Sequence, residues 1–306
     1  MNRPRARRPL AAALLSGLFV VTLATAAPAE DGWAQTGTGI TAGISGIAVT
    51  GQDGAVITET VVVHDNKRTG QPRVSRIRPT PGGAPQVDVL RWDGEREPVD
   101  LEALSAVPGV PGELVALESS GRGYHLRLAD DAVRVLREFT VPGVEAGSGH
   151  NHEAFHLTGT PGRLTAVWAH RGQDDDPALL YTAALDWRTL TFGTRRSAEI
   201  RVSFPTTHVR HISDLAVSPS GWVTVTSASD PGDDGPFDSA VHVVGRVLTG
   251  GPDGPRPVPR ARPLRLAVFP GHKIEALACA SAARAVLGTD DENAGGSWRV
   301  TSLCPR

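Results

Sequence analysis

Cysteine, methionine and aromatic residues are scarce in this chain of 306 residues. Two cysteines rule out the multiple-disulfide framework of small secreted domains, and an aromatic content of 5% leaves few rings for a sugar-stacking platform. Long helical periodicity is also nearly absent, whereas the 34 glycines and 24 prolines indicate many turns. The chain therefore predicts a turn-rich β protein.

The first 26 residues have the three-part layout of a secretory signal peptide. A basic start (residues 3–8) precedes an apolar run from Leu10 to Leu23, and Ala24-Thr25-Ala26 is a small-x-small cleavage signal. Cleavage after Ala29 is an alternative, and the export route, general or twin-arginine, stays open. The run is short for a membrane span of about 20 residues, and no other segment is apolar enough. We expect a secreted protein without a membrane anchor.

Charge argues against one class of partner. After removal of residues 1–26 the chain carries 27 basic and 33 acidic residues, a formal net charge of −6. Nucleic-acid binding needs a basic face, so the composition gives no support for a nucleic-acid partner.

One short pattern occurs five times. The copies are ISGIA from Ile44, LEALS from Leu101, HEAFH from His152, ISDLA from Ile212 and IEALA from Ile274. The second position is Ser or Glu, the third is small or acidic, and the fourth is apolar. Successive copies are 57, 51, 60 and 62 residues apart. Repeats of this length are typical of propellers and arrays.

Each copy predicts the same local structure. A turn residue, glycine in four of the five units, follows eight to ten residues after the Ser/Glu position, and a β-type apolar run comes next. Two further strand-like runs complete most units. We therefore predict an all-β fold, a five-bladed β-propeller of four-stranded antiparallel blades, as one domain over residues 27–306. Because the fifth unit ends after about three strands, residues 32–40 are expected to supply its outer strand and close the ring. A pair of β-sandwiches is the alternative.

The two cysteines are expected to form a disulfide, because export permits one. Cys279 and Cys304 fall on the first and third strands of the fifth unit, and those strands should be about 9.5 Å apart. A disulfide needs Cα atoms within about 7 Å. The pairing thus requires one cysteine to leave its strand.

Blade topology predicts which residues share a face. In an antiparallel blade the start of the first strand and the loop between strands two and three lie on the same face of the disk, here called the top. Seven of the ten histidines map to this face, together with acidic runs such as Asp174-Asp175-Asp176 and Asp290-Asp291-Glu292. Ligand sites favour concave places with converging polar groups, so the top mouth of the channel is the predicted site.

Three glutamates hold the same repeat position and should converge on the channel axis: Glu102, Glu153 and Glu275. Oxygen ligands would favour Ca²⁺, whereas participation of His150 or His272 would favour Zn²⁺. The alternative is that each glutamate accepts hydrogen bonds from neighbouring backbone amides.

Acid–base catalysis is a second interpretation of the same face. Glu153, His152 and His211 are the candidate catalytic residues, because a carboxylate or a histidine near neutral pKa can transfer protons. A carboxylate pair across the channel would suit glycoside hydrolysis.

The phrases ISGIAV, DLEAL, HNHEAF, HISDLAVSPSG and GHKIEALA resemble the inner-strand phrases of secreted propellers. The resemblance, over residues 43–306, is to the phytase-like and esterase-like group and to gluconolactonase-type calcium-dependent hydrolases. It implies a propeller in which some inner-strand glutamates bind metal, although those families have six units. It favours a metal-dependent hydrolase of phosphoester, lactone or glycan substrates. The alternative is a non-enzymatic propeller that binds a glycan or a protein outside the cell.

Overall fold

The computed structural model describes residues 32–143, 151–281 and 283–305. Within them the secondary structure is β-strand throughout, apart from two 3₁₀ turns, η1 (Ile40–Ala42) and η2 (Glu292–Ala294). The all-β prediction is confirmed. No helix in these ranges is long and apolar enough to span a membrane.

The first two units each consist of four consecutive strands. The first contains β2 (Gly46–Asp53), β3 (Val56–Val63), β4 (Val74–Arg78) and β5 (Gln86–Asp93). The second contains β6 (Leu101–Ala106), β7 (Glu113–Glu118), β8 (Arg122–Leu128) and β9 (Ala132–Thr140).

The other three units follow the same plan with changes at their outer strands. The third contains β10 (His152–Thr160), β11 (Arg163–His170) and β12 (Ala178–Asp186), with β13 (Thr191–Phe192) and β14 (Arg196–Ile200) both paired to β12. The fourth contains β15 (Val209–Val217), β16 (Trp222–Ser229), β17 (Asp238–Leu248) and β18 (Arg256–Pro270). The fifth contains β19 (Ile274–Ser281), β20 (Ala283–Thr289), β21 (Gly296–Cys304) and, from the start of the chain, β1 (Ala34–Gly37).

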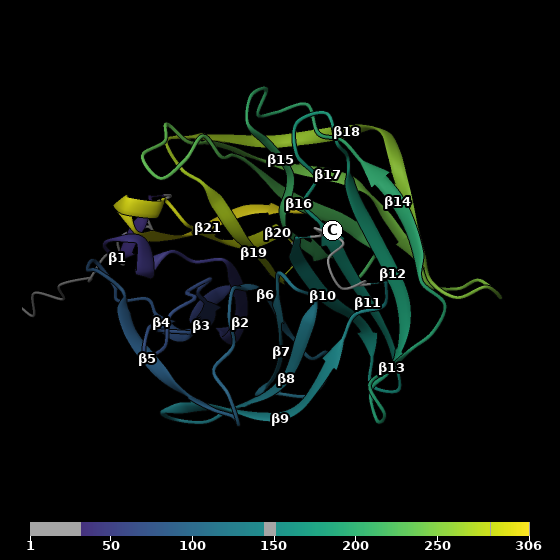
Figure 1. Ribbon diagram of the computed structural model, residues 1–306, viewed down its shortest axis with the longest axis horizontal. Coiled ribbons are helices and arrows are strands. Elements are labelled where there is room, and N and C mark those ends of the chain that lie inside the picture. Colours follow the sequence, from purple (N-terminus) through teal and green to yellow (C-terminus); the bar gives the residue numbers. More distant parts are fainter. Residues whose placement is uncertain (1–31, 144–150, 282, 306) are drawn as a thin grey trace, which may run out of the picture.

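The five units form a closed, propeller-like ring (Figure 1). The first strands of neighbouring units contact one another in the order β2, β6, β10, β15 and β19, and β19 returns to contact β2. Five buried apolar clusters each join two consecutive units, and the cluster around Ile44 and Ala276 joins the fifth to the first. Apolar burial therefore stabilises every junction of the ring, including the one that closes it.

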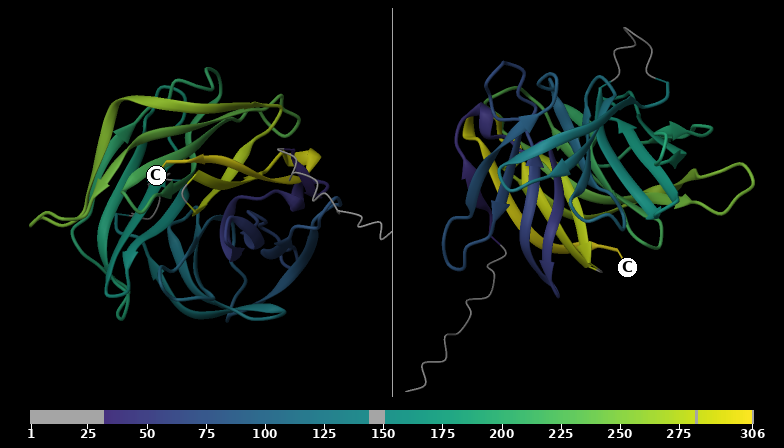
Figure 2. Two further views of the ribbon diagram at one scale, coloured as in Figure 1. Left: turned by 180° about the vertical axis from the view of Figure 1, so that it is seen from behind. Right: turned by 90° about the horizontal axis from the view of Figure 1, so that it is seen from below.

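The strand expected to close the ring is present. β1 pairs antiparallel with β21, with Ala34 opposite Trp298. Both views of Figure 2 show this purple segment beside the yellow strands of the chain's last unit. Because β1 caps an edge that would otherwise be open, it also protects the fifth sheet from pairing with other chains.

The sheets depart from the expected plan in one place. The first two units are fused into one eight-stranded sheet, because β5 pairs parallel with β9 between residues 91–93 and 132–134. The prediction of five separate antiparallel blades is therefore wrong at this junction, and the described residues form four sheets. The outer strands of two neighbouring units satisfy each other's exposed backbone groups, which removes two open edges.

The third position of the repeat lies where the inner strands approach most closely. It is a fully buried alanine in three units: Ala103, Ala154 and Ala276. In the first unit it is Gly46, where a Cβ would lie 2.7 Å from the backbone nitrogen of Leu104. In the fourth it is Asp214, whose carboxylate accepts a hydrogen bond of 2.6 Å from the Leu277 amide. Small size or a bridging carboxylate is thus required there, which explains the pattern in the sequence.

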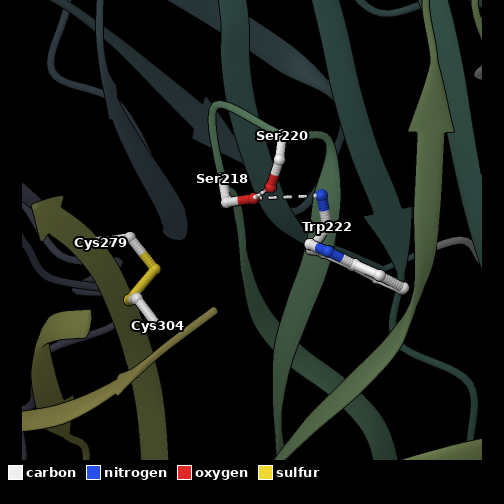
Figure 3. Close-up of a disulfide and its surroundings, with 5 residues drawn as sticks. All are labelled: Ser218, Ser220, Trp222, Cys279 and Cys304. Atoms are coloured by element: carbon white, nitrogen blue, oxygen red, sulfur yellow. Dashed lines mark hydrogen bonds between the residues drawn. A yellow bond between two sulfur atoms is a disulfide. The ribbon is translucent and has the colours of Figure 1, made fainter. Parts of the chain in front are cut away.

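The predicted disulfide between Cys279 and Cys304 is formed (Figure 3). Its Cα atoms are 5.8 Å apart, although both cysteines lie inside their strands and β20 lies between them. The expectation that one cysteine must leave its strand is wrong. The β19–β20 pairing is irregular between Cys279 and Ser281, and the β20–β21 pairing between Ala283 and Ala285. These bulges bend the strands locally. As a result, β19 and β21, which lie on either side of β20, approach each other at this end of the sheet.

Candidate functional site: a charged channel mouth

The repeated glutamates are the extra residues of β-bulges. In β10, His152 pairs with His170 and Ala154 with Ala169, so no residue lies opposite Glu153. The same two-against-one register surrounds two more inner-strand residues, Glu102 and Glu275. A bulge re-aims a side chain away from the alternation of its strand. The repeat position therefore directs these carboxylates out of the normal alternation of side chains along the strand. They lie at the end of the ring where the inner strands begin, and we call this end the channel mouth.

Arginine side chains bind two of these glutamates. The Arg210 guanidinium lies 2.6 Å from Glu275 Oε1 and 3.9 Å from Glu153 Oε2, and it also contacts the Asp230 carboxylate. Arg171 adds a contact of 3.3 Å to Glu153. Because Arg210 joins carboxylates from three units, it shows that side chains from β10, β15 and β19 converge across the mouth.

A buried lysine forms the second centre of this network. Lys273 is 2% exposed, and its Nζ lies 3.2 Å from Glu275 Oε1 and 3.8 Å from Asp290 Oδ2 and contacts the Glu292 carboxylate. Burial acts to lower the pKa of Lys273, but the carboxylates, Glu275 first, outweigh it and raise the pKa. We call Glu153, Glu275, Asp230, Asp290 and Glu292, with Arg171, Arg210 and Lys273, the bridged cluster.

The other side of the mouth has acids without matching bases. Glu102 is 9% exposed, and no described residue donates a hydrogen bond to its carboxylate or pairs with it as an ion. The same holds for Asp65, which follows β3 and is partly buried. Asp100 has one cation, Lys67, whose Nζ lies 2.9 Å from Oδ1. We call Asp65, Asp100, Glu102 and Lys67 the open rim.

The pKa values follow this division. Burial raises the pKa of Glu102 well above its ordinary value, and the neighbouring carboxylates, Glu153 first, raise it further. Burial and Glu275 raise the pKa of Asp65 to about 6. Burial also raises the pKa of Glu153, but Arg210 and Arg171 act against it. The two guanidinium groups thus favour the ionised form of Glu153, whereas no cation of the described residues contacts the Glu102 carboxyl.

The two candidate catalytic histidines, His152 and His211, are both buried. His152 is 2% exposed, and its ring centroid lies 6.3 Å from that of Tyr181. His211 Nε2 donates a hydrogen bond of 2.8 Å to the Asp174 carbonyl, and its Nδ1 accepts one of 3.3 Å from the Val202 amide. Both nitrogens of His211 thus hold backbone segments in place, and burial lowers the pKa of that ring.

The two remaining predicted histidines are His272 and His150, which were expected to bind a metal ion. His272 Nδ1 lies 2.8 Å from Asp291 Oδ2, and its ring centroid is 4.5 Å from that of Trp33. His150 lies outside the described residues. Within the ranges the structure describes, no group of three His, Cys, Asp or Glu side chains is arranged to hold one metal ion. The protein's own cations occupy the carboxylates of Glu153 and Glu275 instead.

None of the basic residues of the mouth was among the candidate site residues predicted from the sequence. The chain has 31 basic residues, and only two of them are lysines, Lys67 and Lys273. Both lie at the mouth. Lys273 directly precedes β19 and lies two residues before Glu275. This rarity was the signal that would have identified them.

A hollow of about 1,060 Å³ lies at the opposite end of the ring from the charged mouth. It is bordered by the disulfide and by the turn before Trp222 (Figure 3), and none of the described residues that line it is Asp or Glu. Ser218 Oγ lies 2.9 Å from Ser220 Oγ and accepts a hydrogen bond of 3.2 Å from the Trp222 amide. Because these hydroxyls complete their own turn, the charged mouth is the better candidate site.

Comparison with solved structures shows the fold. A GH43 endo-arabinanase from Bacillus licheniformis superimposes with a TM-score of 0.50 at 13% identity, over 89% of this chain and 97% of that one. A protein described as a glycoside hydrolase matches with a TM-score of 0.48 at 12% identity, over 88% of this chain and 61% of that one, so this chain spans less than two thirds of it. The Neurospora crassa Pan2 WD40 domain gives a TM-score of 0.34 at 10% identity, covering 82% of this chain and 74% of that domain. No protein-family profile and no curated protein sequence matches. The chain thus resembles β-propeller structures in fold alone.

Proposed function

We propose that this protein is an exported five-bladed β-propeller that hydrolyses glycosidic bonds with a pair of glutamates. The observation that carries the proposal is the contrast between two bulge-borne carboxylates on neighbouring inner strands. Glu102 has no cation partner and a raised pKa, whereas Glu153 contacts two guanidinium groups. Two carboxylates whose surroundings favour opposite protonation states are the usual arrangement for glycoside hydrolysis.

The roles follow from the two environments. Protonated Glu102 donates its proton to the leaving glycosidic oxygen as the bond from that oxygen to the anomeric carbon breaks. A water molecule forms the new bond to that carbon, and the carboxylate of Glu153 accepts its proton. Arg171 and Arg210 favour the ionised form of Glu153 against the effect of burial, and its charge also stabilises the oxocarbenium-like transition state.

The metal prediction does not enter this mechanism. Ca²⁺ or Zn²⁺ at the mouth stays a prediction from the sequence, to be tested by metal analysis of the purified protein. The glycosidic substrate class is preferred over phosphoesters because the open rim carries uncompensated acids, which repel a phosphate. The solved structure of similar fold is an endo-arabinanase by description, and a substrate of that general class is part of this proposal.

The test is turnover by Glu102→Gln on a panel of aryl glycosides and polysaccharides. We expect kcat to fall by roughly 100-fold to 10,000-fold, the usual contribution of a general acid, while the thermal midpoint is unchanged or higher. Glu113→Gln is the matched control. Glu113 is also buried, with partners His125 at 2.8 Å and Arg127, away from the mouth, so its loss should lower stability and leave kcat unchanged.

Full activity of the Glu102→Gln variant would contradict this mechanism. A wild-type protein that binds a glycan or a protein without turning over any glycoside would favour the alternative, a non-enzymatic binding propeller.

A further inference from the structure

The open rim has room for one more positive charge. Its three acids, Asp65, Asp100 and Glu102, face a single cation, Lys67. Glu102 is more than nine-tenths buried and yet has no described partner. A buried carboxylate without a partner is costly, whereas the comparable carboxylates of the bridged cluster all have one. The rim is therefore an incomplete ion-pair network that a ligand can complete.

Lys67 shows what kind of group the rim accepts. Its ammonium lies 2.9 Å from Asp100, and its side chain is 62% exposed. Burial acts to lower the pKa of Lys67, but Asp100, Asp65 and Glu102 together raise it. An ammonium group at this position thus has one directly contacting carboxylate, Asp100, and two further acids that favour its charged form. Because the Lys67 side chain is mostly in solvent, it can leave when another ammonium group takes its place.

An organic cation suits this geometry better than a metal ion. The described carboxylates are not gathered closely enough for three of them to hold one ion. An ammonium group on a sugar ring is bulkier, needs no closed coordination shell, and can donate to acids on two sides. An anionic group would instead meet three acids and a single cation, Lys67.

We propose that Asp65 and Asp100 supply the negative charge of a subsite for a positively charged amino group, that the Glu102 carboxyl accepts a hydrogen bond from that group through its carbonyl oxygen, and that the substrate is a glycan containing an unacetylated amino sugar. The substrate class rests on the proposed function, whereas the amine-binding subsite does not.

Two matched probes test the subsite by calorimetry: a glucosamine trisaccharide, whose amines are charged, and the N-acetylglucosamine trisaccharide, whose amides are neutral. We expect the amine form to bind at least tenfold more tightly in low salt, with the difference shrinking as salt is raised. Asp65→Asn should weaken binding of the amine form at least fivefold and leave the neutral form unchanged. Equal binding of the two probes would overturn the proposal.

The variant Lys67→Met gives a more specific test, because it removes the protein's own ammonium group, which competes with the ligand for Asp100. Affinity for the amine probe should rise about threefold or more, which no purely structural role for Lys67 would produce. The matched control is Arg262→Met, which removes an exposed positive charge on β18 and should change nothing. A weaker affinity in Lys67→Met would also contradict the subsite.

The outcomes separate this inference from the proposed function. Tight amine binding without hydrolysis of either probe supports the subsite and argues against the glycosidase. Hydrolysis of neutral glycosides with no preference for amine probes supports the glycosidase and rejects the subsite.

Discussion

Both sides of the channel mouth carry carboxylates, but the two sides differ in how many cations contact those carboxylates. In the bridged cluster, Arg210 and Lys273 each contact at least three carboxylates, and both cations are largely buried. In the open rim, Lys67 contacts one acid and lies mostly in solvent. Both sides are built from inner-strand starts and from the loops that follow the second strands of their units.

One repeat position thus serves two purposes in this ring. Glu102, Glu153 and Glu275 are equivalent in sequence and all lie at bulges. Their neighbours decide whether the carboxylate stabilises the ring or stays available for a ligand. A buried ion pair contributes mainly by avoiding the cost of an isolated charge. We therefore expect mutations in the bridged cluster to affect folding, and mutations in the open rim to affect ligands.

The two lysines give the largest contrast. Lys273→Met leaves the acids around it without their ammonium, and breaking a buried pair in this way costs about 3–5 kcal/mol. Lys67→Met removes a mostly exposed pair with Asp100, for which we expect a loss of about 0.5 kcal/mol or less. Urea unfolding of both variants at pH 7 measures the difference. Equal losses would show that the two sides of the mouth are not distinct.

Arg210 and Lys273 should act as one unit, because both contact Glu275. Arg210→Met is expected to destabilise the protein by about 3 kcal/mol. In the double variant the losses should not add, and we expect an interaction energy of about 0.5–3 kcal/mol from the double-mutant cycle. Pairing Arg210→Met with Lys67→Met is the control, since these residues share no contact and should be additive. Additivity in the first cycle would contradict the picture of one network.

Much of the ring could be predicted from the sequence. The repeat locates the inner strands, because their alternation and small third position are local properties of each unit. The closing strand follows from the count of strands in the last unit. The fusion of the first two sheets could not be predicted, since it depends on the distance between β5 and β9 once both have folded.

The sequence predicted the acidic residues of the site but not the basic residues that contact them. The repeat identified the positions of Glu102, Glu153 and Glu275. The direction in which their side chains point depends on a β-bulge, and a bulge is formed together with the partner strand. Arg210 and Arg171 were missed for the same reason: Arg210 lies beside an irregular stretch of β15, and Arg171 lies just beyond the end of β11. A histidine at the start of a strand, such as His211, can use both ring nitrogens to hold neighbouring backbone, and the sequence does not distinguish that role from a catalytic one.

Asp65 should show the clearest dependence of folding stability on pH. Its pKa of about 6 exceeds the value of about 3.9 for an unfolded chain, and Lys67, Asp100, Glu275 and Glu292 are the charged groups that act on it. Between about pH 4 and pH 6 the folded state binds more protons than the unfolded state, so this group makes stability fall as pH rises through that window. Above it the penalty is complete.

Asp65→Asn removes that penalty. We expect a gain of about 1–2 kcal/mol at pH 7.5, with the magnitude reduced because the side chain is partly exposed, and no gain near pH 4. Thermal unfolding of both proteins at the two pH values measures it, with Asp53→Asn on the exposed end of β2 as the control. The same variant is predicted to bind the amine probe more weakly, so stability and affinity should move in opposite directions. An acid kept at a cost to folding, and needed for a ligand, is what a binding site requires. A loss of stability in Asp65→Asn would mean instead that Asp65 belongs with the bridged cluster.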